Sequence, residues 1–164
     1  MGQWLKILRE EVVMTCREIL VFVFLYLCSW PLHAADEAVE FFDHYVALGD
    51  AFDKDIVNLY ADDAVIRSYR AYPFGFERNM ELTGVQWKDL VSQVMPLSKL
   101  KGDRSLFSDI SITNLDDGYR IEANRYSVLK CYTDSGYYMV IKYMDDGDLR
   151  IVEEYFETRP LPDC

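Results

Sequence analysis

Three Asp-containing turns ending in glycine divide the last third of this sequence into four segments with the composition of β-strands. The turns are "DDG" at 116–118, "DSG" at 134–136 and "DDG" at 145–147. The segments around them, rich in β-branched and aromatic residues, cover 104–115, 119–131, 137–145 and 149–158. Because such turns join antiparallel neighbours, this part of the chain predicts a meandering antiparallel sheet.

Helical patterns precede the sheet. Residues 36–48 and 85–100 carry apolar side chains at helical spacing, and we expect Pro96 to interrupt the second of these helices. A shorter helix is predicted at 51–60. Helices followed by antiparallel strands predict an α+β fold in which the helices cover one face of the sheet.

The adjacent carboxylates Asp62 and Asp63 stand between the short helix and a strand-like segment at 64–71. Aspartate side chains bond readily to nearby backbone amides, so we interpret the pair as a turn rather than as a catalytic pair. The Pro- and Gly-punctuated stretch "YPFGFERNMELTG" at 72–84 is predicted to be an irregular loop, for which a lid over a site is one role.

Composition and charge limit the function. A chain of 164 residues with 51% hydrophobic and 15% aromatic residues can bury the core of one globular domain. The formal net charge of -11 argues against binding of nucleic acid or of an anionic membrane, because such surfaces need clustered Lys and Arg, and the 17 basic residues here are scattered along the sequence.

An apolar run, "ILVFVFLYLCSW" at 19–30, sets the N-terminal part of the sequence apart. At about 12 residues it is short for a membrane-spanning helix. With Arg17 before it and small residues at Ala34 and Ala35, it resembles the core of a signal peptide cleaved near those alanines.

This interpretation predicts a signal peptide at 1–35, a domain at 36–159 and a C-terminal tail at 160–164. The mature protein is then periplasmic or secreted, with no membrane contact after signal cleavage. An uncleaved signal anchor is the alternative, and the sequence leaves open whether translation starts at Met1 or at Met14.

Two cysteines, Cys131 and Cys164, remain after cleavage, which is an even number for an oxidising compartment. We predict a disulfide that pins the tail against a strand, with two free thiols as the alternative. Neither the cysteines nor His33 and His44 have the spacing of a metal site, so we expect no metal and no other cofactor.

The order of the predicted elements, with a short helix ending in "LYADDAVI" and a last strand "LRIVEEYFE", resembles the nuclear transport factor 2-like superfamily over about residues 36–159. We identify the chain as an exported bacterial member of this superfamily, which includes ketosteroid isomerases, SnoaL-type cyclases and scytalone dehydratase. The resemblance implies a strongly curved antiparallel sheet wrapped around the helices, a cone-shaped, cystatin-like α+β roll with a pocket at one end. It implies no single chemistry, because function depends on the pocket residues. Resembling proteins are often dimers, so a homodimer is also expected.

The known bases of the family do not carry over to this sequence. In ketosteroid isomerases the aspartate that abstracts the proton occupies the position that corresponds to Ser68. Serine cannot act as this base near neutral pH without an activating partner. A site of the scytalone-dehydratase type needs histidine, for which only His44 remains. No catalytic residue is assigned, and we favour a domain that binds a small apolar or aromatic ligand, or a partner protein. The alternative is a small lyase, isomerase or cyclase with Glu153 or Asp63 as general base.

Strand alternation together with the resemblance selects side chains for the pocket wall. On the last strand, Glu153 and Tyr155 are predicted to point inward. A buried glutamate needs a cationic partner, so we predict an Arg125–Glu153 pair, with a surface ion pair as the alternative. The candidate pocket residues, for whose aromatic members core packing is the other role, are Tyr45, Tyr60, Tyr69, Trp87, Asn124, Arg125, Tyr126, Tyr143, Glu153 and Tyr155.

Overall fold

The computed structural model of this protein describes residues 31–160 and 164. The apolar run at 19–30, and with it most of the predicted signal peptide, lies outside the described residues. The chain divides into two compact units, Met1–Glu37 and Ala38–Cys164, and the second unit contains the sheet and both cavities discussed below.

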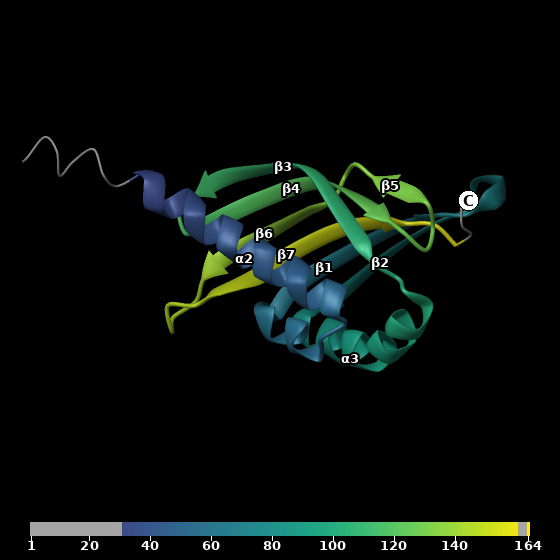
Figure 1. Ribbon diagram of the computed structural model, residues 1–164, viewed down its shortest axis with the longest axis horizontal. Helices are drawn as coiled ribbons and strands as arrows, with labels where there is room; N and C mark the ends of the chain where they lie inside the picture. The colour runs from purple at the N-terminus through teal and green to yellow at the C-terminus, as the bar shows by residue number, and fades with distance from the viewer. Residues whose placement is uncertain (1–30, 161–163) are drawn as a thin grey trace, which may run out of the picture. The chain divides into compact units, whose positions relative to one another are not determined.

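The described chain forms an α+β fold in which all the helices precede β3 and the strands from β3 to β7 follow one another (Figure 1). The helices are α2 (Pro31–Ala51), η1 (Lys54–Leu59), η2 (Pro73–Gly75) and α3 (Gly84–Lys101). The strands are β1 (Tyr60–Ala71), β2 (Glu77–Thr83), β3 (Ser105–Leu115), β4 (Gly118–Ser127), β5 (Tyr132–Asp134), β6 (Tyr138–Tyr143) and β7 (Leu149–Thr158). The α+β class predicted from the sequence is confirmed.

The strands form one curved sheet in the order β2-β1-β7-β6-β4-β3, with β5 paired to β4 (Figure 1). All its neighbouring pairs are antiparallel except β1 and β7, which run parallel, so the sheet is mixed rather than purely antiparallel as expected. Turn signals specify only the pairing of consecutive strands. The pairing of β1 with β7 joins segments far apart in the sequence, and no turn motif in the sequence predicts it.

The core lies between α2 and one face of the sheet. Ala38 and Phe42 of α2 are buried, and the Phe42 ring meets Phe107 of β3 edge-on at a centroid distance of 5.2 Å. Each large apolar side chain buried in this way contributes roughly 1.5–3 kcal/mol. The sheet supplies further fully buried side chains, among them Ile66, Ile121, Met139, Ile141 and Ile151.

Asp62 and Asp63 do not form a turn, contrary to the prediction. They lie inside β1, where the pairing of β1 with β7 shifts register between Tyr60 and Val65. Both aspartates are exposed at this irregularity, and Asp62 accepts a hydrogen bond from Lys88 Nζ at 2.7 Å. A bulge of this kind needs no glycine or proline, which is why the sequence does not distinguish it from a turn.

Two further predictions between β1 and β3 are wrong. The expected loop at 72–84 forms η2 and the edge strand β2, whose exposed polar side chains hide the strand pattern. Helix α3 continues through Pro96 instead of stopping there. It ends at Lys101 and is followed by Gly102, whose φ of 63° is left-handed. Pro96 is solvent-exposed, so its ring meets no packed neighbour on the outer side of the helix.

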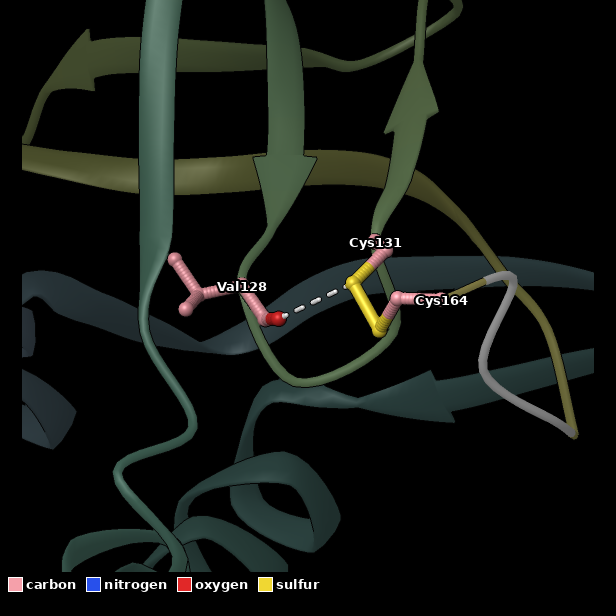
Figure 2. The surroundings of a disulfide bond; sticks show 3 residues. All are labelled: Val128, Cys131 and Cys164. Atoms are coloured by element: carbon pink, nitrogen blue, oxygen red, sulfur yellow. Dashed lines mark hydrogen bonds between the residues drawn. A yellow bond between two sulfur atoms is a disulfide. The ribbon is translucent and has the colours of Figure 1, made fainter.

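The predicted strand at 119–131 is divided in the structure. Strand β4 ends at Ser127, and β5 begins at Tyr132 after a turn. Cys131, next to β5, forms the predicted disulfide with Cys164, with a Cα–Cα distance of 5.4 Å (Figure 2). Among the described helices, none combines the length and apolar character that crossing a membrane requires.

Candidate ligand-binding site

A cavity of about 230 Å³ lies between the sheet and the helices of the second unit. Residues of α2, η1, α3, β3, β4 and β7 line it. Most of its wall is apolar or aromatic and includes Val46, Ile56, Val91, Met95, Phe107 and Phe156. A cavity of this size and character is suited to a small apolar body.

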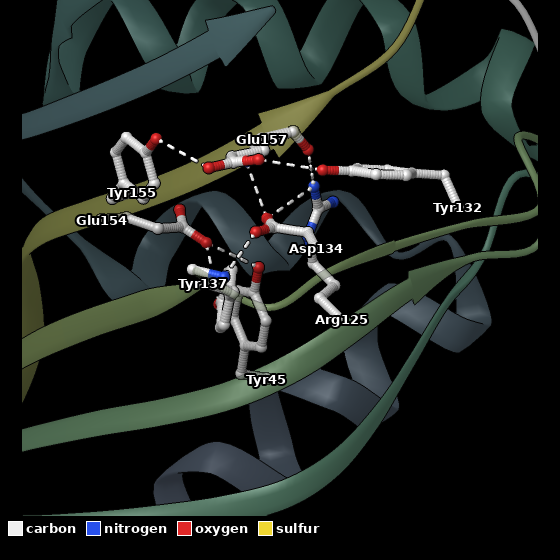
Figure 3. A network of polar contacts seen from close by, with 9 residues as sticks. Tyr45, Arg125, Tyr132, Asp134, Tyr137, Glu154, Tyr155 and Glu157 are labelled. Carbon is white, nitrogen blue, oxygen red and sulfur yellow. Dashed lines mark hydrogen bonds and ion pairs between the residues drawn. The ribbon is translucent and has the colours of Figure 1, made fainter.

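A buried carboxylate, that of Glu154 on β7, is the polar centre of this cavity. Its side chain is 2% exposed. Oε1 accepts hydrogen bonds from the hydroxyls of Tyr45 at 3.1 Å and Tyr137 at 2.9 Å (Figure 3). Oε2 accepts one from the hydroxyl of Tyr60 at 2.7 Å. A carboxylate offers about four acceptor positions. Within the described residues, one position on Oε2 therefore stays available to a ligand.

Glu154 faces the cavity because β7 contains one extra residue. In the pairing with β6, Ile141 stands opposite Ile151 and Val140 opposite Glu153, so Val152 has no partner. Such a bulge reverses the alternation of side chains beyond it. Ile151 and Glu154 are therefore both buried, and the orientation predicted for the second half of β7 was wrong.

Burial raises the pKa of the Glu154 carboxyl, against the opposing effect of the hydrogen bonds from Tyr60 and Tyr137 and of the nearby Arg125 charge. Burial, followed by the charge of Glu154, also raises the pKa of Tyr45, Tyr60 and Tyr137. The three phenols thus stay protonated near neutral pH and act as hydrogen-bond donors.

Arg125 on β4 borders the cavity beside Phe156, with its guanidinium carbon 5.2 Å from the centroid of that ring. Nη2 donates to the Glu157 carbonyl oxygen at 2.6 Å and lies 3.5 Å from the carboxylate of Asp134, which is fully buried (Figure 3). Nε is buried and makes no hydrogen bond to the described residues.

Trp87 on α3 provides a second buried donor in the cavity wall. Its rings lie 6.2 Å from Tyr60 and 5.5 Å from Phe156, measured between ring centroids. Nε1 meets no acceptor with hydrogen-bond geometry among the described residues, although the Tyr60 hydroxyl is near enough for the indole N–H to lower the pKa of that phenol. An unsatisfied buried donor costs about 1–3 kcal/mol, which an acceptor atom of a bound ligand would recover.

Four of the predicted pocket residues line the cavity: Tyr45, Tyr60, Trp87 and Arg125. The others lie outside its wall, namely Tyr69, Asn124, Tyr126, Tyr143, Glu153 and Tyr155. Glu154 and Tyr137 also line the cavity and were not predicted from the sequence. Glu154 is the second glutamate of "EEY", and Tyr137 is the first tyrosine of "YYM". Strand alternation predicted that Glu153 points inward and Glu154 outward, which is the reverse of what the structure shows.

The predicted Arg125–Glu153 pair is not formed. Glu153 accepts hydrogen bonds from Arg67 Nη1 at 2.8 Å and from the Tyr138 hydroxyl at 2.7 Å, outside the cavity wall. Arg125 pairs with Asp134 instead. The reason is the extra residue in β7, which places Glu153 on the opposite side from Glu154.

The other candidate bases lie elsewhere. Asp63 and His44 are exposed, and Ser68 is buried in β1 but does not line the cavity. In the part of the chain that the structure describes, no group of three or more His, Cys, Asp and Glu side chains is arranged to hold a metal ion.

No protein-family model matches the sequence, and no curated protein matches it. Solved structures do resemble it. An NTF2-like protein of unknown function from Pseudomonas putida is 12% identical, with 74% of this chain and 84% of that chain covered and a TM-score of 0.56. A candidate ketosteroid isomerase from Parabacteroides distasonis is 13% identical, with 73% and 83% covered and a TM-score of 0.52.

An NTF2-like protein with a cystatin-like fold from Novosphingobium aromaticivorans is 16% identical, with 84% of this chain and 86% of that chain covered and a TM-score of 0.53. At these identities the likeness concerns the fold. The chain has the nuclear transport factor 2-like fold that its sequence resembles, with a polar centre inside a largely apolar cavity.

Proposed function

We propose that this protein binds a small, largely apolar or aromatic ligand in the cavity around Glu154. The observation that carries the proposal is the pattern of unused hydrogen-bonding groups in a mostly apolar wall. Among the described residues, Trp87 Nε1 is a buried donor without an acceptor, and Glu154 Oε2 has an open acceptor position. A ligand with one acceptor and one hydroxyl or amine on a ring system would satisfy both.

The volume of the cavity supports a ligand larger than a single ring. An apolar cavity of about 150 Å³ in another protein holds benzene. The cavity here measures about 230 Å³, and Arg125 lies in the wall that it shares with a neighbouring pocket. A two-ring compound such as 2-naphthol therefore has a suitable size and carries one hydroxyl.

Fluorescence titration with 2-naphthol tests the proposal with a matched pair of variants on α3. Val91 lines the cavity, whereas Val85 is 56% exposed on the same helix and lies outside it. We expect Val91→Phe to fill the cavity and weaken binding at least about tenfold, which is about 1.4 kcal/mol, and Val85→Phe to leave binding unchanged. Equal binding by both variants, or no binding of two-ring compounds to the wild type, would contradict the proposal.

A second candidate function is acid–base catalysis by Glu154. It is favoured by the raised pKa of a buried carboxyl that keeps one acceptor position open in the cavity. Glu154 replaces Glu153 and Asp63 as the candidate base, since neither of these lines the cavity. The test is NMR detection of deuterium exchange at the carbon next to the carbonyl of 2-tetralone in heavy water. Catalysis predicts acceleration by the wild type that Glu154→Gln abolishes; exchange no faster than in buffer removes this candidate.

We also infer that the mature protein works in an oxidising compartment, as the predicted signal peptide suggests. The Cys131–Cys164 bond supports this inference, because such bonds persist mainly outside the reducing cytosol. Intact-mass analysis of the protein recovered from the cell envelope or medium should give a chain that starts near residue 35 and lacks two hydrogen atoms. A full-length, reduced chain recovered only from the cytosol would contradict the inference.

A further inference from the structure

A second pocket, which we call the basic pocket, adjoins the cavity around Glu154. It has a volume of about 320 Å³. The two hollows have four lining residues in common, Asp103, Ser105, Arg125 and Phe156. They are therefore neighbours that share one wall, with Arg125 at the junction.

The charge of the basic pocket is opposite to that of the protein. Its lining includes four of the 17 basic residues of the chain, Arg70, Arg125, Lys130 and Arg159. It includes only two of the 28 acidic residues, Asp103 and Glu157. A local excess of cationic side chains on a chain of net charge -11 marks this pocket as the place where an anion is attracted.

Lys130 and Arg125 keep unused hydrogen-bond donors in the basic pocket. The Glu157 carboxylate accepts hydrogen bonds from the hydroxyls of Tyr132 at 2.9 Å and Tyr155 at 3.2 Å. Lys130 Nζ donates to the carbonyl oxygen of Pro160 at 3.1 Å, a neutral acceptor. Arg125 pairs with Asp134, yet its Nε is buried without a partner among the described residues. An oxyanion is the acceptor that such a set of donors favours.

We propose that the basic pocket binds the anionic group of an amphipathic ligand whose apolar rings occupy the cavity around Glu154. This inference rests on the proposed function and names the ligand class: a cyclic or aromatic compound that carries a carboxylate, phosphate or sulfate. Arg125 and Arg70 would face the oxyanion. The charge of Glu154 repels a second anion, so the ligand enters with its rings toward Glu154 and its oxyanion toward the basic pocket.

Three naphthalene probes of similar size test the inference on the oxidised mature protein by calorimetric titration. They are 1-naphthaleneacetate, its neutral amide 1-naphthaleneacetamide, and 1-naphthyl phosphate. We expect one or both anions to bind at least about tenfold more tightly than the amide, and the tighter anion to identify the oxyanion preferred. Equal binding of amide and anions overturns the inference and leaves the proposed function intact. Binding of none of the three overturns both.

Charge variants add a control that does not depend on Arg125, which also supports the buried Asp134. The double variant Arg70→Gln with Lys130→Gln removes two charges from the lining of the basic pocket. We expect it to weaken binding of the anions about tenfold and to leave the amide unchanged. Arg120→Gln on β4, whose guanidinium covers Tyr138 at 3.7 Å and lines neither hollow, is the matched control and should change nothing. Equal effects of both variants on the anions would overturn the inference.

Discussion

Glu153 and Glu154 are neighbours in the chain with opposite surroundings. Glu153 has a side chain 34% exposed and pairs with Arg67, an arrangement worth about 0–1 kcal/mol. Glu154 is 2% exposed and accepts hydrogen bonds from three phenols. The unpaired Val152 before them decides which glutamate turns inward. One inserted residue thus places an ionisable group at the centre of the cavity.

We expect Glu154 to make stability depend on pH in a defined direction. Burial raises its pKa above the ordinary value of 4.5. As pH rises through that value, the unfolded chain releases this proton before the folded chain does, so the free energy of unfolding falls until the raised pKa is passed. Glu154→Gln lacks this fall. The difference in free energy of unfolding, wild type minus variant, should therefore decrease as the pH rises above about 4.

Urea unfolding at several pH values measures that difference. Contributions of other titrating groups, such as the buried Asp134, are present in both proteins and cancel to first order. Asp62→Asn serves as the control. The hydrogen bond from Lys88 lowers the pKa of Asp62, so the difference between the wild type and this variant should not decrease over the same range. A difference that grows with pH for Glu154→Gln would show that the phenol hydrogen bonds outweigh burial.

Asp134 gives a second prediction at a single residue. It is fully buried, accepts hydrogen bonds from the backbone N–H of Glu157 at 2.7 Å and of Gly136 at 3.0 Å, and pairs with Arg125. Asp134→Ala leaves these donors buried without a partner and should lower the free energy of unfolding by about 3 kcal/mol. Asp62→Ala breaks a shorter ion pair, 2.7 Å to Lys88, but its side chain is 79% exposed. That change should cost under about 1 kcal/mol, and equal costs in chemical denaturation would contradict the argument from burial.

The site residues on helices were predicted from the sequence more accurately than the site residues on strands. Tyr45 and Trp87 were found because helical periodicity is local and survives small errors of register. The orientation of a strand residue depends on every residue before it in the strand, so the bulge at Val152 reversed Glu153 and Glu154. The second half of β7 therefore could not be oriented without the pairing to β6.

At the scale of elements, the close approach of α3 to β1 fixes the helix that carries Trp87. Gly84, the first residue of α3, is buried, and a Cβ atom there would lie 1.8 Å from the carbonyl oxygen of Ala61. Ala61 belongs to the irregular part of β1 near the two aspartates. Because both contacting groups belong to the backbone, a side chain at position 84 fits only if β1 or α3 moves.

We therefore expect Gly84→Ala to destabilise the fold by about 3 kcal/mol and to weaken ligand binding, because α3 must shift. Gly49→Ala in α2 is the matched change, since its added Cβ would meet only the Ile56 side chain at 3.9 Å. Gly49 lies in the last turn of α2, so that change should stabilise by less than about 1 kcal/mol. Thermal and urea unfolding of the two variants measure the two changes in stability. If Gly84→Ala does not lower the free energy of unfolding, α3 and β1 are less tightly packed than the structure shows.

Helices and strands that have a short-range pattern in the sequence were predicted, and those without one were not. The helix within 36–48 and the strands β3, β6 and β7 were predicted because periodicity and turns mark them directly. The edge strand β2 was missed, since its exposed side chains need not alternate, and the parallel pairing of β1 with β7 has no local signal. These two features complete the sheet on the side where α3 packs.

At the scale of the whole molecule, the C-terminal tail contributes to the wall of the basic pocket. Arg159 and Pro160 line it together with Lys130, the residue before Cys131. The disulfide to Cys164 holds the end of this segment to the strand that begins at Tyr132. Stability and the shape of the basic pocket are therefore linked through one covalent bond.

Reduction of this bond should lower stability measurably. The bonded cysteines are 33 residues apart, which in the chain-entropy model corresponds to about 4 kcal/mol. We expect dithiothreitol to lower the midpoint of thermal unfolding of the wild type by roughly 10 °C. The double variant Cys131→Ser with Cys164→Ser should start near the lower value and not respond to the reductant. If the reductant shifts both proteins equally, the bond does not contribute to stability. If only the wild type responds, anionic naphthalene probes should also bind it less tightly after reduction, because the segment that forms one side of the basic pocket is released.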